Sequence, residues 1–108
     1  MTVGELAAKL NLKTFNESDF DREITCGYCG DLLSWVMGRA KEGCVWFTVM
    51  NNINIAAVAL LADAACIVIS EGSIPDEAVK KAAEDNDINI LTSDLPVYEL
   101  AVECSKLI

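Results

Sequence analysis

Several residue types that most functional classes depend on are scarce or missing in this chain. It has no histidine, two prolines and only eight lysines and arginines, against seventeen aspartates and glutamates, which gives a formal net charge of -9. A protein that binds a nucleic-acid backbone or an anionic membrane displaces counterions with clustered basic side chains. We therefore expect neither nucleic acid nor membrane among its partners.

Long hydrophobic runs and secretion signals are also absent. The longest apolar stretch, Ile53–Ala62, is too short to span a bilayer, and Met1–Glu5 lacks the basic and apolar regions of a signal peptide. The five cysteines are odd in number and are not spaced like a secreted disulfide framework. These features predict a cytoplasmic protein whose thiols are reduced.

The composition favours a single folded domain. The chain has 108 residues, of which 53% are hydrophobic, and it has no linker, internal repeat or low-complexity tract. A sequence of this length and composition can bury a core of its own. We expect one compact domain over residues 1–108.

Apolar periodicity predicts alternating strands and helices. Buried or half-buried strands are expected at 23–26, 44–50, 66–69 and 88–91. A fully apolar helix is expected at 53–62. The sum is an α/β domain with a mainly parallel sheet of about four to five strands and helices packed on it.

The other helices are predicted from their caps and apolar faces. Thr2 is expected to cap a first helix, Asp31 a second, and Ser93 or Asp94 the last, while Pro75 with Asp76 and Glu77 opens the fourth. Gly43 is expected to close the connection after the second helix. The expected core-facing positions are Leu6, Ala7, Leu10, Leu32, Leu33, Val36, Met37, Ala40, Ala78, Val79, Ala82, Ala83, Val97, Leu100, Ala101 and Cys104.

Four polar clusters each follow an apolar run and precede a helical pattern. If the runs are parallel strands, all four clusters lie at the carboxyl edge of one sheet, where open α/β folds bind ligands. The clusters are Cys26–Asp31, Asn51–Asn54, Ser70–Ser73 and Thr92–Asp94. The candidate ligand-binding residues are Tyr28, Asn51, Asn52, Asn54, Ser70, Gly72, Thr92 and Ser93.

Over nearly its whole length the chain resembles small stand-alone DRTGG-type domains, which are similar to the N-terminal, non-kinase domain of HPr kinase/phosphorylase. The resemblance is carried by Asp21–Tyr28, Gly30–Ser34, Val36–Met37, Gly43, Trp46–Thr48, Asn54–Ile55, Gly72, Pro75–Asp76 and Ile90–Thr92. It implies a regulatory or binding domain rather than a catalytic one. Stand-alone members are associated with anaerobic hydrogenase or other redox enzyme systems.

The sequence departs from this family at the motif that gives it its name. The loop that aligns with Asp-Arg-Thr-Gly-Gly is Val49–Asn54, which contains no acidic residue, arginine or glycine. The amides of Asn51, Asn52 and Asn54 stand there instead.

No catalytic arrangement is evident in the sequence. A phosphoryl-transfer enzyme of this relationship needs a glycine-rich phosphate loop followed by Lys and Ser/Thr, and the chain has none. Glu71, Asp76 and Asp94 could form an acid/base pair or hold a cation, but a position near a helix N-terminus explains Asp76 and Asp94 equally well. We expect no enzymatic activity and no cofactor.

The alternative function is thiol chemistry at Cys26-Gly27-Tyr28-Cys29, which the pattern places just before a helix N-terminus. Two thiols at this spacing can form a redox disulfide, or can supply half of a four-thiolate metal site. The other half is poorly provided, so we expect no metal. The preferred function is non-catalytic: regulation or assembly through a small-molecule ligand, a partner enzyme or a homo-oligomer.

Overall fold

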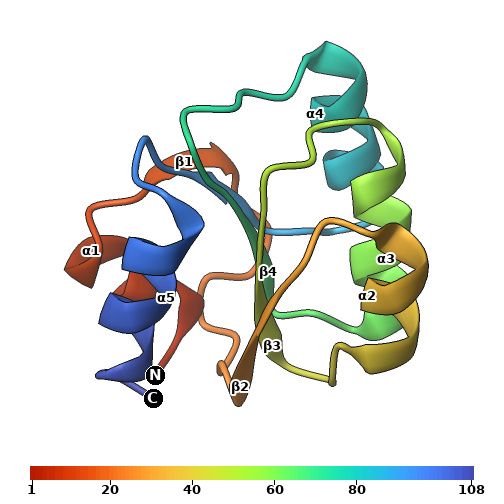
Figure 1. The fold of residues 1–108 in the computed structure, drawn as a ribbon. Helices are drawn as coiled ribbons and strands as arrows, with labels where there is room; N and C mark the ends of the chain where they lie inside the picture. Colours follow the sequence, from red (N-terminus) through yellow and green to blue (C-terminus); the bar gives the residue numbers. More distant parts are fainter.

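A computed structural model describes all 108 residues. The chain forms five helices and five strands (Figure 1). In order they are α1 (Val3–Lys9), β1 (Lys13–Asn16), β2 (Cys26–Cys29), α2 (Leu33–Arg39), β3 (Cys44–Thr48), α3 (Asn54–Ala62), β4 (Cys66–Ile69), α4 (Glu77–Asp85), β5 (Ile90–Thr92) and α5 (Val97–Ser105).

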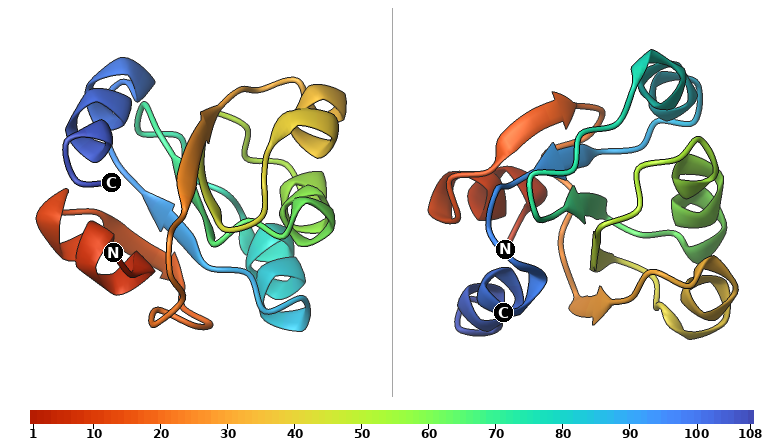
Figure 2. Two further views of the ribbon diagram at one scale, coloured as in Figure 1. Left: turned by 90° about the horizontal axis from the view of Figure 1, so that it is seen from below. Right: turned by 45° about the horizontal axis from the view of Figure 1, so that its top comes forward.

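The strands form one five-stranded sheet in the order β1-β5-β4-β3-β2. Strands β2 to β5 are parallel, and β1 is added antiparallel to β5 at one edge. Helices α2, α3 and α4 cover one face of the sheet, while α1 and α5 lie on the other (Figure 2). The predicted α/β fold class is confirmed, with a single compact domain and a mostly parallel sheet.

Each face of the sheet has its own core. Successive strand residues point to opposite faces, so Trp46 packs under α2–α4 while Phe47 packs toward α1 and α5. Both side chains are almost completely buried. None of the helices is long and apolar enough to cross a membrane.

Several local predictions are confirmed. Thr2 and Glu5 form a reciprocal capping box, with both N–H···O distances at 3.1 Å. The Asp76 carboxylate accepts from the Val79 N–H at 3.1 Å and caps α4. Gly43 has a positive φ of 79°, as a turn glycine should.

The strand predictions near the N-terminus are wrong in position. The strand expected at 23–26 lies at 26–29, because Cys26–Cys29 pairs in register with the buried strand β3. Strand β1 was not predicted, since Lys13–Asn16 is short and polar. It is held by a buried amide, Asn16 Nδ2, which donates to the Ile88 carbonyl at 2.9 Å.

The strand expected at 88–91 is Ile90–Thr92, where β5 pairs with both β4 and β1.

Two predicted caps and three core positions are also wrong. Helix α2 is preceded by Leu32 and not capped by Asp31, and α5 begins after Pro96 and is capped by neither Ser93 nor Asp94. Ser93 Oγ instead accepts from the Leu95 N–H at 3.1 Å. Three side chains expected in the core are exposed. Leu32 precedes α2, and Met37 on α2 and Ala78 on α4 lie on the solvent sides of their helices.

Candidate functional site

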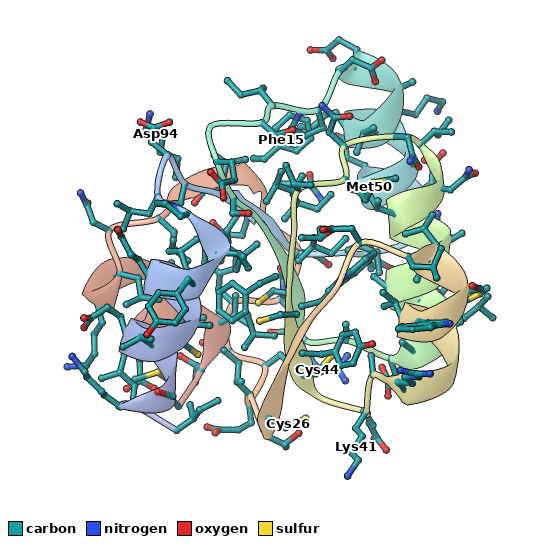
Figure 3. The ribbon with its side chains drawn as sticks, in the orientation of Figure 1. Phe15, Cys26, Lys41, Cys44, Met50 and Asp94 are labelled. Atoms are coloured by element: carbon teal, nitrogen blue, oxygen red, sulfur yellow. The ribbon has the colours of Figure 1, made fainter.

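The parallel strands bring four loops to one edge of the sheet. Strands β2, β3, β4 and β5 all end there, so the loops that follow them are neighbours, as the sequence predicts. The first predicted cluster is the exception, because Cys26–Cys29 forms strand β2 itself and only Gly30 and Asp31 follow it at this edge. Met50 and Asp94 belong to this edge, whereas Cys26 and Cys44 lie at the opposite, amino-terminal end of their strands (Figure 3). The loops do not form one cavity, but they surround a cleft near β2 and β3.

This carboxyl-edge cleft has a volume of about 470 Å³ and combines an apolar floor with an acidic rim. Phe47, Val49 and Val97 supply the apolar part, and Asp31 and Glu71 supply two carboxylates. The full lining is Cys29, Gly30, Asp31, Phe47, Val49, Ser70, Glu71 and Val97. No lysine or arginine lines it, so its electrostatic potential favours a cation or a hydrogen-bond donor.

Asp31 is fixed by β3 rather than by α2. One of its carboxylate oxygens, Oδ1, accepts from Thr48 Oγ1 at 2.8 Å and from the Val49 N–H at 2.9 Å. Thr48 Oγ1 accepts in turn from the Met50 N–H at 3.1 Å. The other oxygen, Oδ2, has no partner within the chain, so the carboxylate can receive a donor from a ligand in the cleft.

A side chain on Gly30, beside Asp31, would crowd the Tyr28 ring. A Cβ on Gly30 would lie 2.9 Å from Cε2 of the Tyr28 ring. Its backbone is also engaged on both sides, because its N–H donates to the Phe47 carbonyl at 3.1 Å and its carbonyl accepts from Trp46 Nε1 at 2.8 Å. This close packing holds Asp31 at the end of β2.

The opposite rim of the cleft is a tight turn, Ser70–Ser73, in which two consecutive residues are left-handed. Glu71 has a φ of 63° and Gly72 a φ of 73°, and the Ser73 N–H donates to the Ser70 carbonyl at 3.1 Å. A left-handed non-glycine residue costs about 1–2 kcal/mol. The turn is tied to the β5–α5 loop by bonds from the Glu71 and Gly72 N–H groups to Leu95 and Ser93 carbonyls, both at 2.9 Å. These bonds hold Glu71 in its left-handed conformation at the rim.

Only one of the eight predicted ligand-binding residues, Ser70, lines the cleft, and it is nearly fully buried. Its hydroxyl donates to the Thr48 carbonyl at 3.1 Å, so it joins β4 to β3. Thr92 and Ser93 line a separate hollow beside Lys13, whose Nζ lies 3.8 Å from Asp94 Oδ2.

The remaining candidates do not line the cleft. Asn51 Nδ2 donates to Ser73 Oγ at 3.0 Å, and Asn52 Oδ1 accepts from the Asn54 N–H at 2.9 Å. Tyr28 packs against the core on the α2–α4 side of the sheet, while Gly72 shapes the turn described above.

Seven of the eight residues that line the cleft are not among the predicted ligand-binding residues. Val49 was read as strand, and Asp31 was read as a helix cap because it directly precedes an apolar helical pattern. The only sequence signal for Asp31 at the site is its place in the first polar cluster. The carboxyl-edge position of Glu71 was recognised, but not its left-handed backbone.

The Cys26–Cys29 pair does not have the geometry expected for thiol chemistry. The two cysteines begin and end strand β2, and the next helix starts only at Leu33, so neither thiol lies at the helix N-terminus as expected. Residues three apart on a strand point to opposite faces and have Cα atoms about 10 Å apart, beyond the reach of a disulfide. Cys26 packs toward the α2–α4 core, whereas Cys29 faces the α5 side.

Burial raises the pKa of four of the five thiols. Burial, with a further effect of the Asp31 charge, raises the pKa of Cys29. Burial raises the pKa of Cys44 to about 11 and also raises the pKa values of Cys66 and Cys104. Because the thiolate is the reactive form, these raised pKa values disfavour thiol reactivity at neutral pH. No three or more Cys, Asp or Glu side chains come together in a way that could hold a metal ion.

The fold has a counterpart among solved structures. No protein-family model matches the sequence, and no curated protein matches it. The structure superposes on the CBS and DRTGG domains of the regulatory region of Clostridium perfringens pyrophosphatase, solved in complex with its activator, diadenosine tetraphosphate. The TM-score is 0.73 at 11% identity, covering 94% of this chain and 44% of that chain. The expected likeness to a DRTGG-type regulatory domain is confirmed at the level of the fold.

Proposed function

We propose that the chain is a non-catalytic regulatory domain that binds a small-molecule ligand in the carboxyl-edge cleft. The observation that carries this proposal is the cleft itself, with an apolar floor at Phe47 and the Asp31 and Glu71 carboxylates at its rim. A concave apolar surface with a few fixed polar groups is the usual form of a small-molecule site. The fold shared with a regulatory region supports the regulatory part of the proposal.

The charge of the cleft narrows the class of ligand. Two carboxylates and no basic side chain line it, in a chain of net charge -9. A polyphosphate such as diadenosine tetraphosphate would be repelled, so that ligand does not carry over to this chain. The cleft fits a ligand with a protonated amine or another donor at one end and a flat apolar group at the other.

A pair of matched probes tests the ligand class. Phenethylammonium and 3-phenylpropanoate have similar aromatic bodies and opposite charges, and diadenosine tetraphosphate serves as the polyanion. In ¹H–¹⁵N spectra, phenethylammonium should shift the amide signals of Gly30, Val49 and Glu71, with a dissociation constant of roughly 1 mM for so small a ligand. The two anions should leave these signals unchanged.

Charge-removing variants locate the effect in the cleft. Asp31→Asn with Glu71→Gln keeps the shape of the rim and should weaken phenethylammonium binding about tenfold or more. Glu17→Gln removes an exposed carboxylate that follows β1, at the sheet edge opposite β2, and should have no effect. Equal binding of the cation and the anion, or binding of the nucleotide alone, would overturn the proposed ligand class.

We also propose a cellular location and a kind of partner enzyme for the chain. The resemblance to stand-alone DRTGG-type domains favours a cytoplasmic protein that acts with a partner enzyme of an anaerobic hydrogenase or other redox system. Anaerobic purification of the tagged protein from its host tests this. A redox enzyme recovered in stoichiometric amount would support it, and recovery with an unrelated enzyme would refute it.

A further inference from the structure

The solvent side of α3 carries no charge and, apart from the first residue, Asn54, it is apolar. Its exposed apolar side chains are Ile53, Ala57, Leu60 and Leu61, which recur at i, i+4, i+7 and i+8 and therefore form one stripe along the helix, here named the α3 stripe. Ile53 is 54% exposed, Leu60 51% and Leu61 74%. A helix on the surface of a monomer normally carries polar side chains on this side.

The stripe contributes little to the core of its own domain. The inner side of α3 supplies the buried Ile55, Val58 and Ala59, which pack against the sheet. Helices α2 and α4 lie on either side of α3 (Figure 2) and leave the stripe uncovered. Exposed Met37 on α2 and Ala78 on α4 add to the apolar surface of the same layer. Contiguous apolar surface of this kind marks an interface.

The charges of the domain favour a second copy as the occupant. The chain has 25 charged residues, yet none lies between Asn51 and Ala62. Two copies of net charge -9 that approach through other faces bring like charges together, whereas contact through α3 does not.

The charges beside α3 are complementary across a two-fold axis. Helices α2, α3 and α4 all connect parallel strands, so they run in the same direction and their C-terminal ends lie at one end of the layer. At that end α2 finishes with Arg39 and is followed by Lys41 and Glu42. Helix α4 finishes with Glu84 and Asp85, of which Asp85 is paired with Lys81 at 3.5 Å and Glu84 has no ion pair. A two-fold axis parallel to α3 places the basic end of α2 on the acidic end of the partner's α4.

From this geometry we propose that two copies of the chain form a symmetric dimer through the α3 stripe. Helices about 13 Å long and about 10 Å apart give a three-helix layer about 30 Å wide, with a projected area of roughly 400 Å². A stable interface buries about 800 Å² on each partner. The dimer is therefore modest in size, and its dissociation constant is expected at roughly 1–50 μM.

Sedimentation velocity without added ligand tests the dimer independently of the cleft. The wild-type chain should pass from the 11.7 kDa monomer to twice that mass as its concentration rises through the micromolar range. The double variant Leu60→Ser with Leu61→Ser removes apolar surface without adding charge, and it should dissociate at least tenfold more easily. Tyr98→Ser on α5 removes a side chain that is 77% exposed on the other face of the sheet, and it should dimerise like the wild type.

Circular dichroism distinguishes a failed interface from a failed fold. Both variants change surface positions and should keep the native helical spectrum. The melting temperature of the wild type should rise with protein concentration, and that of the Leu60/Leu61 variant should not. A wild type that is monomeric at about 500 μM would overturn the proposal. A dimer that survives the double substitution would also overturn it.

Discussion

Removing the Asp31 side chain should loosen the end of β3 and destabilise the fold. In Asp31→Ala, two hydrogen bonds to a carboxylate are lost, from Thr48 Oγ1 and from the Val49 N–H. Bonds to charged groups contribute about 1.5–3 kcal/mol each when their partners are buried. Thr48 is only 1% exposed, but Val49 is 41% exposed and its N–H can turn to water. We expect a loss of about 2–3 kcal/mol, mostly from the Thr48 bond.

Asp31→Asn separates the hydrogen bonds from the charge. The Asn carbonyl oxygen can accept from both donors, and neutral bonds are about half as strong as charge-assisted ones. The negative charge two residues before α2 is also lost, which costs a few tenths of a kcal/mol. The expected destabilisation is about 1–1.5 kcal/mol, roughly half that of Asp31→Ala.

Urea unfolding followed by circular dichroism measures both variants against Glu17→Ala. This control removes an exposed carboxylate that follows β1 and is expected to change stability by no more than about 0.5 kcal/mol. The informative result is the order of stability among Asp31→Ala, Asp31→Asn and the control. If Asp31→Ala and Asp31→Asn were equally stable, the hydrogen bonds would contribute nothing and the assigned role of Asp31 would be wrong. An Asp31→Ala variant within about 0.5 kcal/mol of wild type would refute it as well.

Three further predictions concern other parts of the chain. Gly43→Ala should lower the free energy of unfolding in urea by about 3 kcal/mol, because its Cβ would lie 2.6 Å from Thr25 Oγ1 at a φ of 79°. Gly38→Ala in α2 is the control: its Cβ meets no atom within 4 Å, so the change should be neutral or stabilising. Hydrogen bonds from Thr2 lower the pKa of Glu5. Glu5 therefore stabilises the fold above its ordinary pKa, and this contribution is lost as the pH falls through the lowered value. Glu5→Gln should flatten the pH dependence of stability between about pH 5 and pH 3. Because burial and then the Asp31 charge raise the pKa of Cys29, iodoacetamide should alkylate it slowly at neutral pH and modestly faster in Asp31→Asn, and an unchanged rate would show that the charge does not act on this thiol.

The sequence predicted those elements whose signals are local. Strand β4 was predicted with its observed bounds, Cys66–Ile69, because a short apolar run between polar clusters fits few other structures. The Asp76 cap was predicted because the pattern of proline, acidic residue and apolar face is specific to a helix N-terminus. Both depend on residues close together in the chain.

Elements that depend on distant partners were missed or displaced. Strand β1 exists because Lys13–Asn16 pairs with β5 and is bonded by Lys80 Nζ, which donates to Asn16 Oδ1 at 2.8 Å, and no local pattern encodes that contact. Strand β2 was displaced because Gly27 and the pair of cysteines are typical of a turn. Only its register with β3 shows that it is a strand.

The candidate site likewise depends partly on local sequence signals and partly on contacts between distant residues. Parallel strands alone place the loops at one edge, so the location of the site was predictable. Its lining was not, because the cleft combines the ends of β2, β3 and β4 with Val97 of α5, which reaches them from the other face of the sheet. Asp31 could be assigned to the cleft only once its carboxylate was seen to bond with β3.

The cleft and the α3 stripe are joined by one short connection. Asp31 bonds to Thr48, and Thr48 in turn accepts from Met50 in the loop that leads into α3. A cationic ligand at Oδ2 withdraws charge from the same carboxylate and so weakens the bond between Oδ1 and Thr48. The loop before α3 is the first segment to respond. If that loop has two arrangements, ligand binding and dimerisation through the stripe change each other's equilibrium by the same factor, because linkage is reciprocal. Phenethylammonium should then shift the dimer dissociation constant of the wild type and not that of Asp31→Asn.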